Sequence, residues 1–120
     1  MATNRIFSIL FLFFVFSSNI FAENTEIPTI KAFIEDDKGQ FNGYLYGLES
    51  GLEWANEHYY RKYNIELFCK PSSISLPASK LRDMVNKSIN SKPGFFKKYE
   101  NEALIGLALR SAYLQEFPCE

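Results

Sequence analysis

Apolar side chains recur at helical spacing in the middle of the chain, between residues 41 and 60. They fall close to the i, i+3, i+4, i+7 stripe that is typical of an amphipathic helix. The stripe comprises Phe41, Tyr44, Leu45, Leu48, Leu52, Ala55 and Tyr59, and the other side carries Glu49, Glu53, Asn56 and Glu57. This pattern predicts a long helix over residues 41–60.

Two further helices are predicted towards the C-terminus. The first follows Ser75, a suitable helix cap, and has Pro77 in its first turn. Its apolar face comprises Leu81, Met84, Val85 and Ile89, and its solvent face comprises Lys80, Arg82, Asp83, Asn86 and Lys87. The second runs from about residue 100 to 115, after the helix-breaking residues 90–94. It has little polar surface, so we expect it to be central.

The remaining segments predict only short elements. Residues 29–35 suit a short helix that starts near Thr29, and residues 35–39 form an acidic turn. Alternation that would favour a strand is nearly absent, and residues 65–68 are the only modest candidate. We therefore expect an all-α, small single-domain bundle of three main helices plus one or two short helices.

The chain contains two cysteines, each beside a phenylalanine and a proline. Phe68-Cys69-Lys70-Pro71 lies in the middle and Phe117-Pro118-Cys119 at the end, so an oxidising compartment permits one intramolecular pairing. Closing a loop of about 50 residues would stabilise the fold by about 4 kcal/mol. We expect a disulfide between Cys69 and Cys119, the alternative being two buried thiols in a reduced protein.

The N-terminus decides between these alternatives. Arg5 precedes an apolar run over residues 6–16, which is too short to span a bilayer, and Ala22 suits a signal peptidase. We expect residues 1–22 to be a signal peptide that directs export to the periplasm, although an uncleaved anchor is an alternative. Residues 23–120 then form one domain without a further membrane segment.

Charge narrows the choice of partners. The whole chain has 13 basic and 14 acidic residues, and removing Arg5 with the signal leaves 12 and 14, a net charge of −2. Nucleic-acid binding would need a basic stripe, so no nucleic-acid partner is expected.

Three glycines, Gly43, Gly47 and Gly51, recur every four residues along the first long helix. Each lowers helix propensity by roughly 0.5–1 kcal/mol relative to alanine. Their repetition indicates that another backbone packs closely here. Intramolecular helix packing is the preferred interpretation, and a homodimer face is the alternative.

Two stretches are candidate partner-binding surfaces. The first is the acidic turn with Glu35, Asp36 and Asp37, and the second is the tyrosine group Tyr59, Tyr60 and Tyr63. An acidic turn could face a basic cleft, and tyrosine is enriched in interface hot spots. The alternative is a solvated turn and tyrosines that cover a small core.

No catalytic constellation, cofactor motif or metal-ligand set is apparent. His58 is the only histidine, and Glu57-His58 lacks the second histidine of a zinc-protease helix. Glu49, Glu53 and Glu57 could suggest a paired-carboxylate hydrolase, but such a row is more often a solvated face. We expect a binding protein rather than an enzyme, with no cofactor and no metal.

The order of motifs resembles the Tai/Rap family of periplasmic immunity proteins, which neutralise type VI secretion peptidoglycan amidases. The motifs are Gly43-Tyr44-Leu45-Tyr46-Gly47, Phe68-Cys69-Lys70-Pro71 and Phe117-Pro118-Cys119, all behind a signal peptide. The resemblance covers residues 41–119 and implies an exported helical domain with the Cys69–Cys119 bridge, often dimeric. It also implies a protein that occludes an amidase active site. Many family members have further cysteines earlier in the chain, and this sequence has none between Ala22 and Cys69.

The function expected from this resemblance is that of an immunity protein that binds and inhibits an amidase effector. The alternative is a small periplasmic helical chaperone or stress protein, which would bind many unfolded clients. One tight partner, and a neighbouring gene that encodes a cysteine–histidine amidase, would favour immunity.

Overall fold

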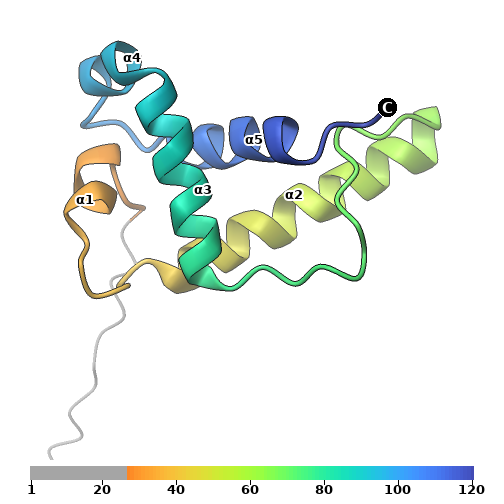
Figure 1. Cartoon of the computed structure of the whole chain (residues 1–120), viewed down its shortest axis with the longest axis horizontal. Coiled ribbons are helices and arrows are strands. Elements are labelled where there is room, and N and C mark those ends of the chain that lie inside the picture. Colours follow the sequence, from red (N-terminus) through yellow and green to blue (C-terminus); the bar gives the residue numbers. More distant parts are fainter. Residues whose placement is uncertain (1–26) are drawn as a thin grey trace, which may run out of the picture.

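The computed structural model describes residues 27–120, which contain five helices and no strand (Figure 1). In chain order the helices are α1 (Ile30–Glu35), α2 (Asn42–Tyr63), α3 (Ala78–Ser91), α4 (Pro93–Lys98) and α5 (Ile105–Glu116). The predicted all-α fold with three main and two short helices is confirmed. Residues 65–68 form no strand. The predicted signal peptide, residues 1–22, lies outside the described residues.

The core lies where α3 crosses α5, with α2 against both (Figure 1). Apolar side chains at helical spacing on these helices fill the core, as the apolar stripes of the sequence predict. The largest fully buried side chains are Tyr113, Phe33, Ile30, Leu45, Leu81, Ile105, Leu109 and Val85. Within the described residues, no helix is both long and apolar enough to cross a membrane.

The short helix α1 is fixed to the connection between α4 and α5. It starts near Thr29, as predicted, and Thr29 is its N-cap, whose Oγ1 accepts a hydrogen bond from the amide of Ala32 at 3.0 Å. The amides of Ile30 and Lys31, which have no partner within the helix, donate to the carbonyls of Glu102 and Glu100. These bonds hold Glu100 and Glu102 beside the start of α1, and residues 99–104 form no helix.

The predicted third helix is therefore wrong at its N-terminal end. It begins at Ile105, so Glu100 and Glu102 precede it, and α4 is a separate helix that starts at Pro93. The prediction that the helix over about residues 100–115 is central is only partly correct, because Ala103 and Leu114 are exposed. The start of α3 also differs from the prediction. Tyr46 Oη, not Ser75, accepts a hydrogen bond from the amide of Ala78 at 2.9 Å, and Pro77 precedes the helix instead of lying in its first turn.

The glycine ridge of α2 does not pack against another segment of residues 27–120. A Cβ built at Gly43, Gly47 or Gly51 would meet nothing within 4 Å, so the predicted intramolecular helix packing is wrong. The close approach between α2 and α5 occurs at Gly106, whose Cβ would lie 3.4 Å from Leu48 Cδ2. The predicted apolar stripe of α2, which includes Leu45 and Leu48, carries this contact, whereas the glycine ridge does not.

Replacing Gly47 with alanine is accordingly expected to raise the free energy of unfolding by about 0.5–1 kcal/mol, because helix propensity improves and no contact is strained. Urea unfolding measures the change. Gly39→Ala is the matched control and should destabilise, because Gly39 has φ of 71° and its Cβ would lie 2.8 Å from Asn42. A loss of stability in Gly47→Ala would instead indicate that a second copy packs on this ridge.

Candidate protein-binding site

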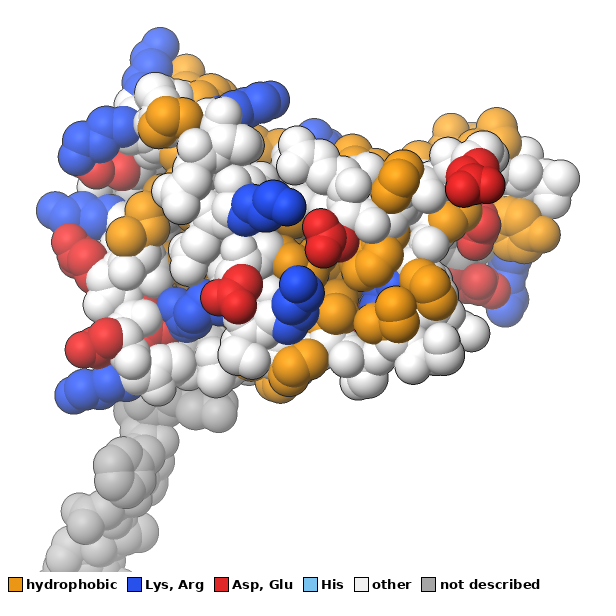
Figure 2. All heavy atoms as spheres, viewed as in Figure 1, with side chains coloured by type: hydrophobic (Ala, Val, Ile, Leu, Met, Phe, Trp, Pro, Cys, Tyr) orange, Lys and Arg blue, Asp and Glu red, His pale blue; other side chains and the backbone are white. Residues whose placement is uncertain are grey.

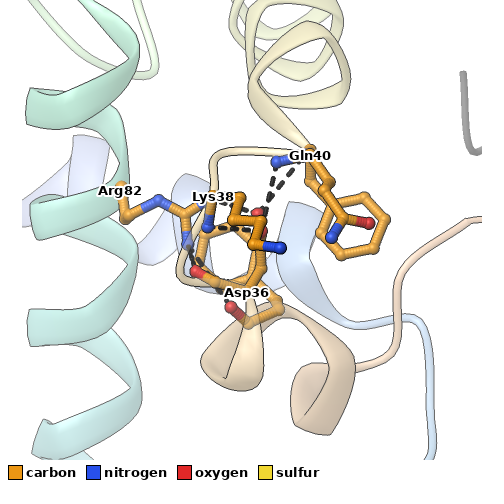
Figure 3. A network of polar contacts seen from close by, with 6 residues as sticks. Asp36, Lys38, Gln40 and Arg82 are labelled. Atoms are coloured by element: carbon orange, nitrogen blue, oxygen red, sulfur yellow. Dashed lines mark hydrogen bonds and ion pairs between the residues drawn. The ribbon is translucent and has the colours of Figure 1, made fainter. Parts of the chain in front are cut away.

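The acidic turn is divided between an internal carboxylate and two exposed ones. Asp36 Oδ2 lies 2.7 Å from Arg82 Nη2 on α3, and the Asp36 side chain is only 1% exposed. Figure 3 shows the carboxylate and the Arg82 guanidinium pointing towards each other, with the turn closed around them. The prediction that Asp36 is a partner contact is wrong, as is the prediction that Arg82 faces solvent. Glu35 and Asp37 are exposed and are still candidates.

Backbone amides complete the environment of Asp36. Its carboxylate oxygens accept hydrogen bonds from the amides of Lys38, Gln40 and Phe41 at 3.1–3.3 Å. Burial opposes ionisation, but the Gln40 amide, the Arg82 guanidinium and the amides of Phe41 and Lys38 outweigh it. The pKa of Asp36 is consequently below its ordinary value of 3.8. The turn is therefore a structural joint between α1, α2 and α3.

The three predicted tyrosines lie at the C-terminal end of α2. Tyr59 and Tyr63 are one turn apart, with ring centroids separated by 4.7 Å, and Tyr59 is half-buried. Tyr60 and Tyr63 are 45% and 52% exposed. The chain then leaves the helix through Asn64, whose φ of 56° reverses its direction, and its amide donates to the carbonyl of Tyr60.

Further apolar side chains follow directly in the linker. Ile65 is 58% exposed and Leu67 is 49% exposed. We call Tyr60, Tyr63, Ile65 and Leu67 the α2 tip. Figure 2 shows apolar side chains gathered over the far end of α2 and the linker that returns from it. Exposed apolar groups gathered on one part of a surface are typical of an interaction site.

Four interactions hold the chain at the α2 tip in place. Asn56 donates through Nδ2 to the carbonyl of Phe68 and accepts through Oδ1 from the amide of Leu67, at 3.0 and 2.7 Å. The predicted disulfide joins Cys69 to Cys119, and the Cys69 amide donates to the carbonyl of Phe117 at 2.8 Å. The exposed patch is therefore fixed to both α2 and the C-terminus, and little ordering is needed when it binds a partner.

The carboxylates of Glu49, Glu53 and Glu57 on α2 all have partners among the described residues. Glu49 accepts a hydrogen bond from the phenol of Tyr113 at 3.0 Å, and Lys70 Nζ lies 3.8 Å from Glu49 and 2.5 Å from Glu53. Burial, followed by Glu49, raises the pKa of Tyr113, so the phenol stays protonated and donates. Glu57 pairs with Arg61 at 2.7 Å. The interpretation of this row as a solvated face is correct for Glu57 but not for Glu49, which is mostly buried.

One group of possible metal ligands comes together among residues 27–120, namely Glu66, Cys69 and Cys119. Both sulfurs are in the disulfide, so neither is available as a thiolate ligand. His58 lies exposed on α2. What this region offers is a fixed, exposed apolar surface.

Sequence reasoning missed the residues that support the candidate site, namely Asn56, Lys70 and Arg82. Each bonds to a residue at least 11 positions away in the sequence, so no local pattern marks the pairing. The one signal in the sequence was that Asn56 and Glu53 lie on the polar side of α2, in the half of the helix that leads into the linker.

Comparison of the chain with family models, with curated proteins and with solved structures gives no match. The resemblance to immunity proteins therefore rests on the order and spacing of the three motifs.

Proposed function

We propose that this protein is a periplasmic immunity protein that binds a type VI secretion peptidoglycan amidase and occludes its active site. The observation that carries the proposal is the α2 tip, an exposed apolar surface held by the Cys69–Cys119 bridge between the second and third motifs. Tyrosine in such a patch combines a large contact area with few rotatable bonds. The signal-like N-terminus supports action in the compartment where peptidoglycan lies.

The direct test asks first whether a neighbouring gene encodes a cysteine–histidine amidase and then uses that amidase. The purified protein should bind that amidase and stop its hydrolysis of peptidoglycan, and the double variant Tyr60→Ala/Tyr63→Ala should weaken binding by about 30-fold or more, the loss typical of a hot spot. Calorimetric titration measures the affinity. Tyr99→Ala is the matched control, because Tyr99 is 37% exposed at the end of α4, away from the α2 tip.

The acidic turn is tested in the same assay through Asp37→Lys. Reversing an exposed charge should slow association if Asp37 faces a basic cleft, and its effect should shrink at high salt. Asp36 is unsuitable for this purpose because its replacement disturbs the fold. Wild-type affinity in both the tyrosine variant and Asp37→Lys would remove the two surfaces from the proposal.

The second candidate is a chaperone, which the number of exposed large apolar side chains favours; Trp54, for example, is 70% exposed. A chaperone would suppress aggregation of several unrelated unfolded proteins, whereas an immunity protein would bind one amidase tightly and ignore them. Suppression of aggregation without binding to the amidase would therefore replace the proposal by this alternative.

A further inference from the structure

A second apolar surface lies on the other side of the fold, where α3, α4 and α5 meet. It is an open groove of about 350 Å³, within the range of small-molecule sites. The apolar residues that line it are Phe95, Phe96, Leu107 and Leu114. Leu107 and Leu114 are two turns apart on α5, so the apolar floor is about 10 Å long. Phe95 and Leu114 are 41% and 44% exposed, so part of this floor is open to solvent.

The polar lining of the groove is asymmetric in charge. It contains the cations Lys92 and Arg110 and no carboxylate. Within residues 27–120, neither cation is in an ion pair, whereas Lys70, Arg82 and Lys97 all are. Figure 2 shows lysine and arginine side chains gathered at the α4 end of the molecule. A ligand seated here would meet two unneutralised positive charges.

Two of the three hydroxyl groups in the groove, those of Ser91 and Ser111, already donate hydrogen bonds within the fold. Ser91 Oγ donates to the carbonyl of Ser88 at 2.7 Å, and Ser111 Oγ donates to the carbonyl of Leu107 at 2.9 Å. Each of these two hydroxyls has one proton and has already used it. The charged donors for an anion are therefore Arg110 and Lys92, beside the neutral side chains of Ser88 and Gln115.

We propose that this groove binds an amphipathic carboxylate of the medium-chain fatty-acid type. The alkyl chain would lie along the floor between Leu107 and Leu114, and the carboxylate would pair with Arg110 and Lys92 at the rim. The other apolar hollow beside α4 lacks this combination, because its cation, Lys97, is already paired with Glu100 at 2.9 Å. This site is separate from the α2 tip and does not depend on the proposed function.

The test is a nuclear magnetic resonance titration of the disulfide-bonded protein with decanoate, below the concentration at which it forms micelles. Saturable shifts are expected at the amides of Leu107, Ser111 and Leu114. Decanol, which lacks the charge, and butyrate, which lacks the chain, should each bind at least about tenfold more weakly. The fluorescence of Trp54, the only tryptophan, should not change, because it lies on α2 outside the groove.

Two variants make the outcome decisive. Arg110→Glu reverses an exposed charge and should weaken decanoate binding by about tenfold or more, whereas Lys62→Glu makes the same charge change at the far end of α2 and should leave it unaltered. Leu114→Asn should also weaken binding, since it removes exposed apolar floor. Shifts centred on the α2 tip, equal binding of decanol and decanoate, or full affinity in Arg110→Glu would overturn the proposal.

Discussion

Replacing Asp36 with alanine is expected to lower the free energy of unfolding by about 3–5 kcal/mol. The change leaves Arg82 without its partner on a side chain that is only 20% exposed, and it leaves the amides of Lys38, Gln40 and Phe41 without an acceptor. Each unsatisfied group adds a desolvation penalty. Arg82 also packs over the ring of Phe33 at 4.6 Å, so the disturbance extends to the contact between α1 and α3.

Urea unfolding of the two proteins measures this effect. The control is Asp37→Ala, the neighbouring carboxylate, which is exposed and should change stability by less than about 0.5 kcal/mol. Similar small losses in both variants would show that the Asp36–Arg82 joint contributes nothing beyond a surface pair.

The same joint predicts part of the acid sensitivity. Because the pKa of Asp36 is lower in the folded protein than its ordinary 3.8, its contribution is fully present above about pH 4. It is lost as the pH falls through the lowered pKa, where the carboxylate takes up a proton and the pair with Arg82 weakens. Asp36→Ala should therefore unfold with a flatter dependence on pH in this range, whereas Asp37→Ala should retain the wild-type dependence.

The elements whose stability is local could be predicted from the sequence. The start of α1 near Thr29 was predicted, and there the Thr29 hydroxyl accepts a hydrogen bond from an amide three residues away. Leu81, Val85 and Ile89 were assigned to one apolar face because helical spacing puts them together, and all three are buried. The disulfide was predictable because the sequence has only two cysteines, which permit one pairing, and a signal-like N-terminus.

The parts that could not be predicted depend on distant partners. Glu100 looks like a first-turn helix residue in the sequence. Its carbonyl instead accepts a hydrogen bond from the amide of Lys31, 69 residues away, and the helix starts later, at Ile105. In the sequence, Asp36 looks like a solvated carboxylate, because nothing local indicates its ion pair with Arg82 on α3. At the candidate site, Tyr60 and Tyr63 were predicted from the sequence. Ile65 and Leu67 were not, because their place beside the tyrosines depends on the contacts of Asn56 and on the disulfide.

Removing the disulfide by the double variant Cys69→Ser/Cys119→Ser is expected to lower the free energy of unfolding by about 4 kcal/mol. The two residues are separated by 50 positions, so the open chain gains much conformational freedom when unfolded. A domain of this size is stable by only about 5–15 kcal/mol, so the variant should be close to its unfolding threshold at 37 °C. Urea unfolding of the variant and of the reduced wild type should give the same value.

The disulfide has a local effect that distinguishes it from a general source of stability. Without the disulfide, only the Asn56 hydrogen bonds and one backbone hydrogen bond to Phe117 hold the linker at Cys69. Amide hydrogen exchange should therefore accelerate first at Leu67 and Cys69 and not in the α3–α5 core. Amidase affinity should fall as well, because the α2 tip would have to be ordered on binding. Faster exchange with unchanged affinity would mean that the partner does not contact the α2 tip. A uniform acceleration over all helices would mean that the bridge acts only on the unfolded chain.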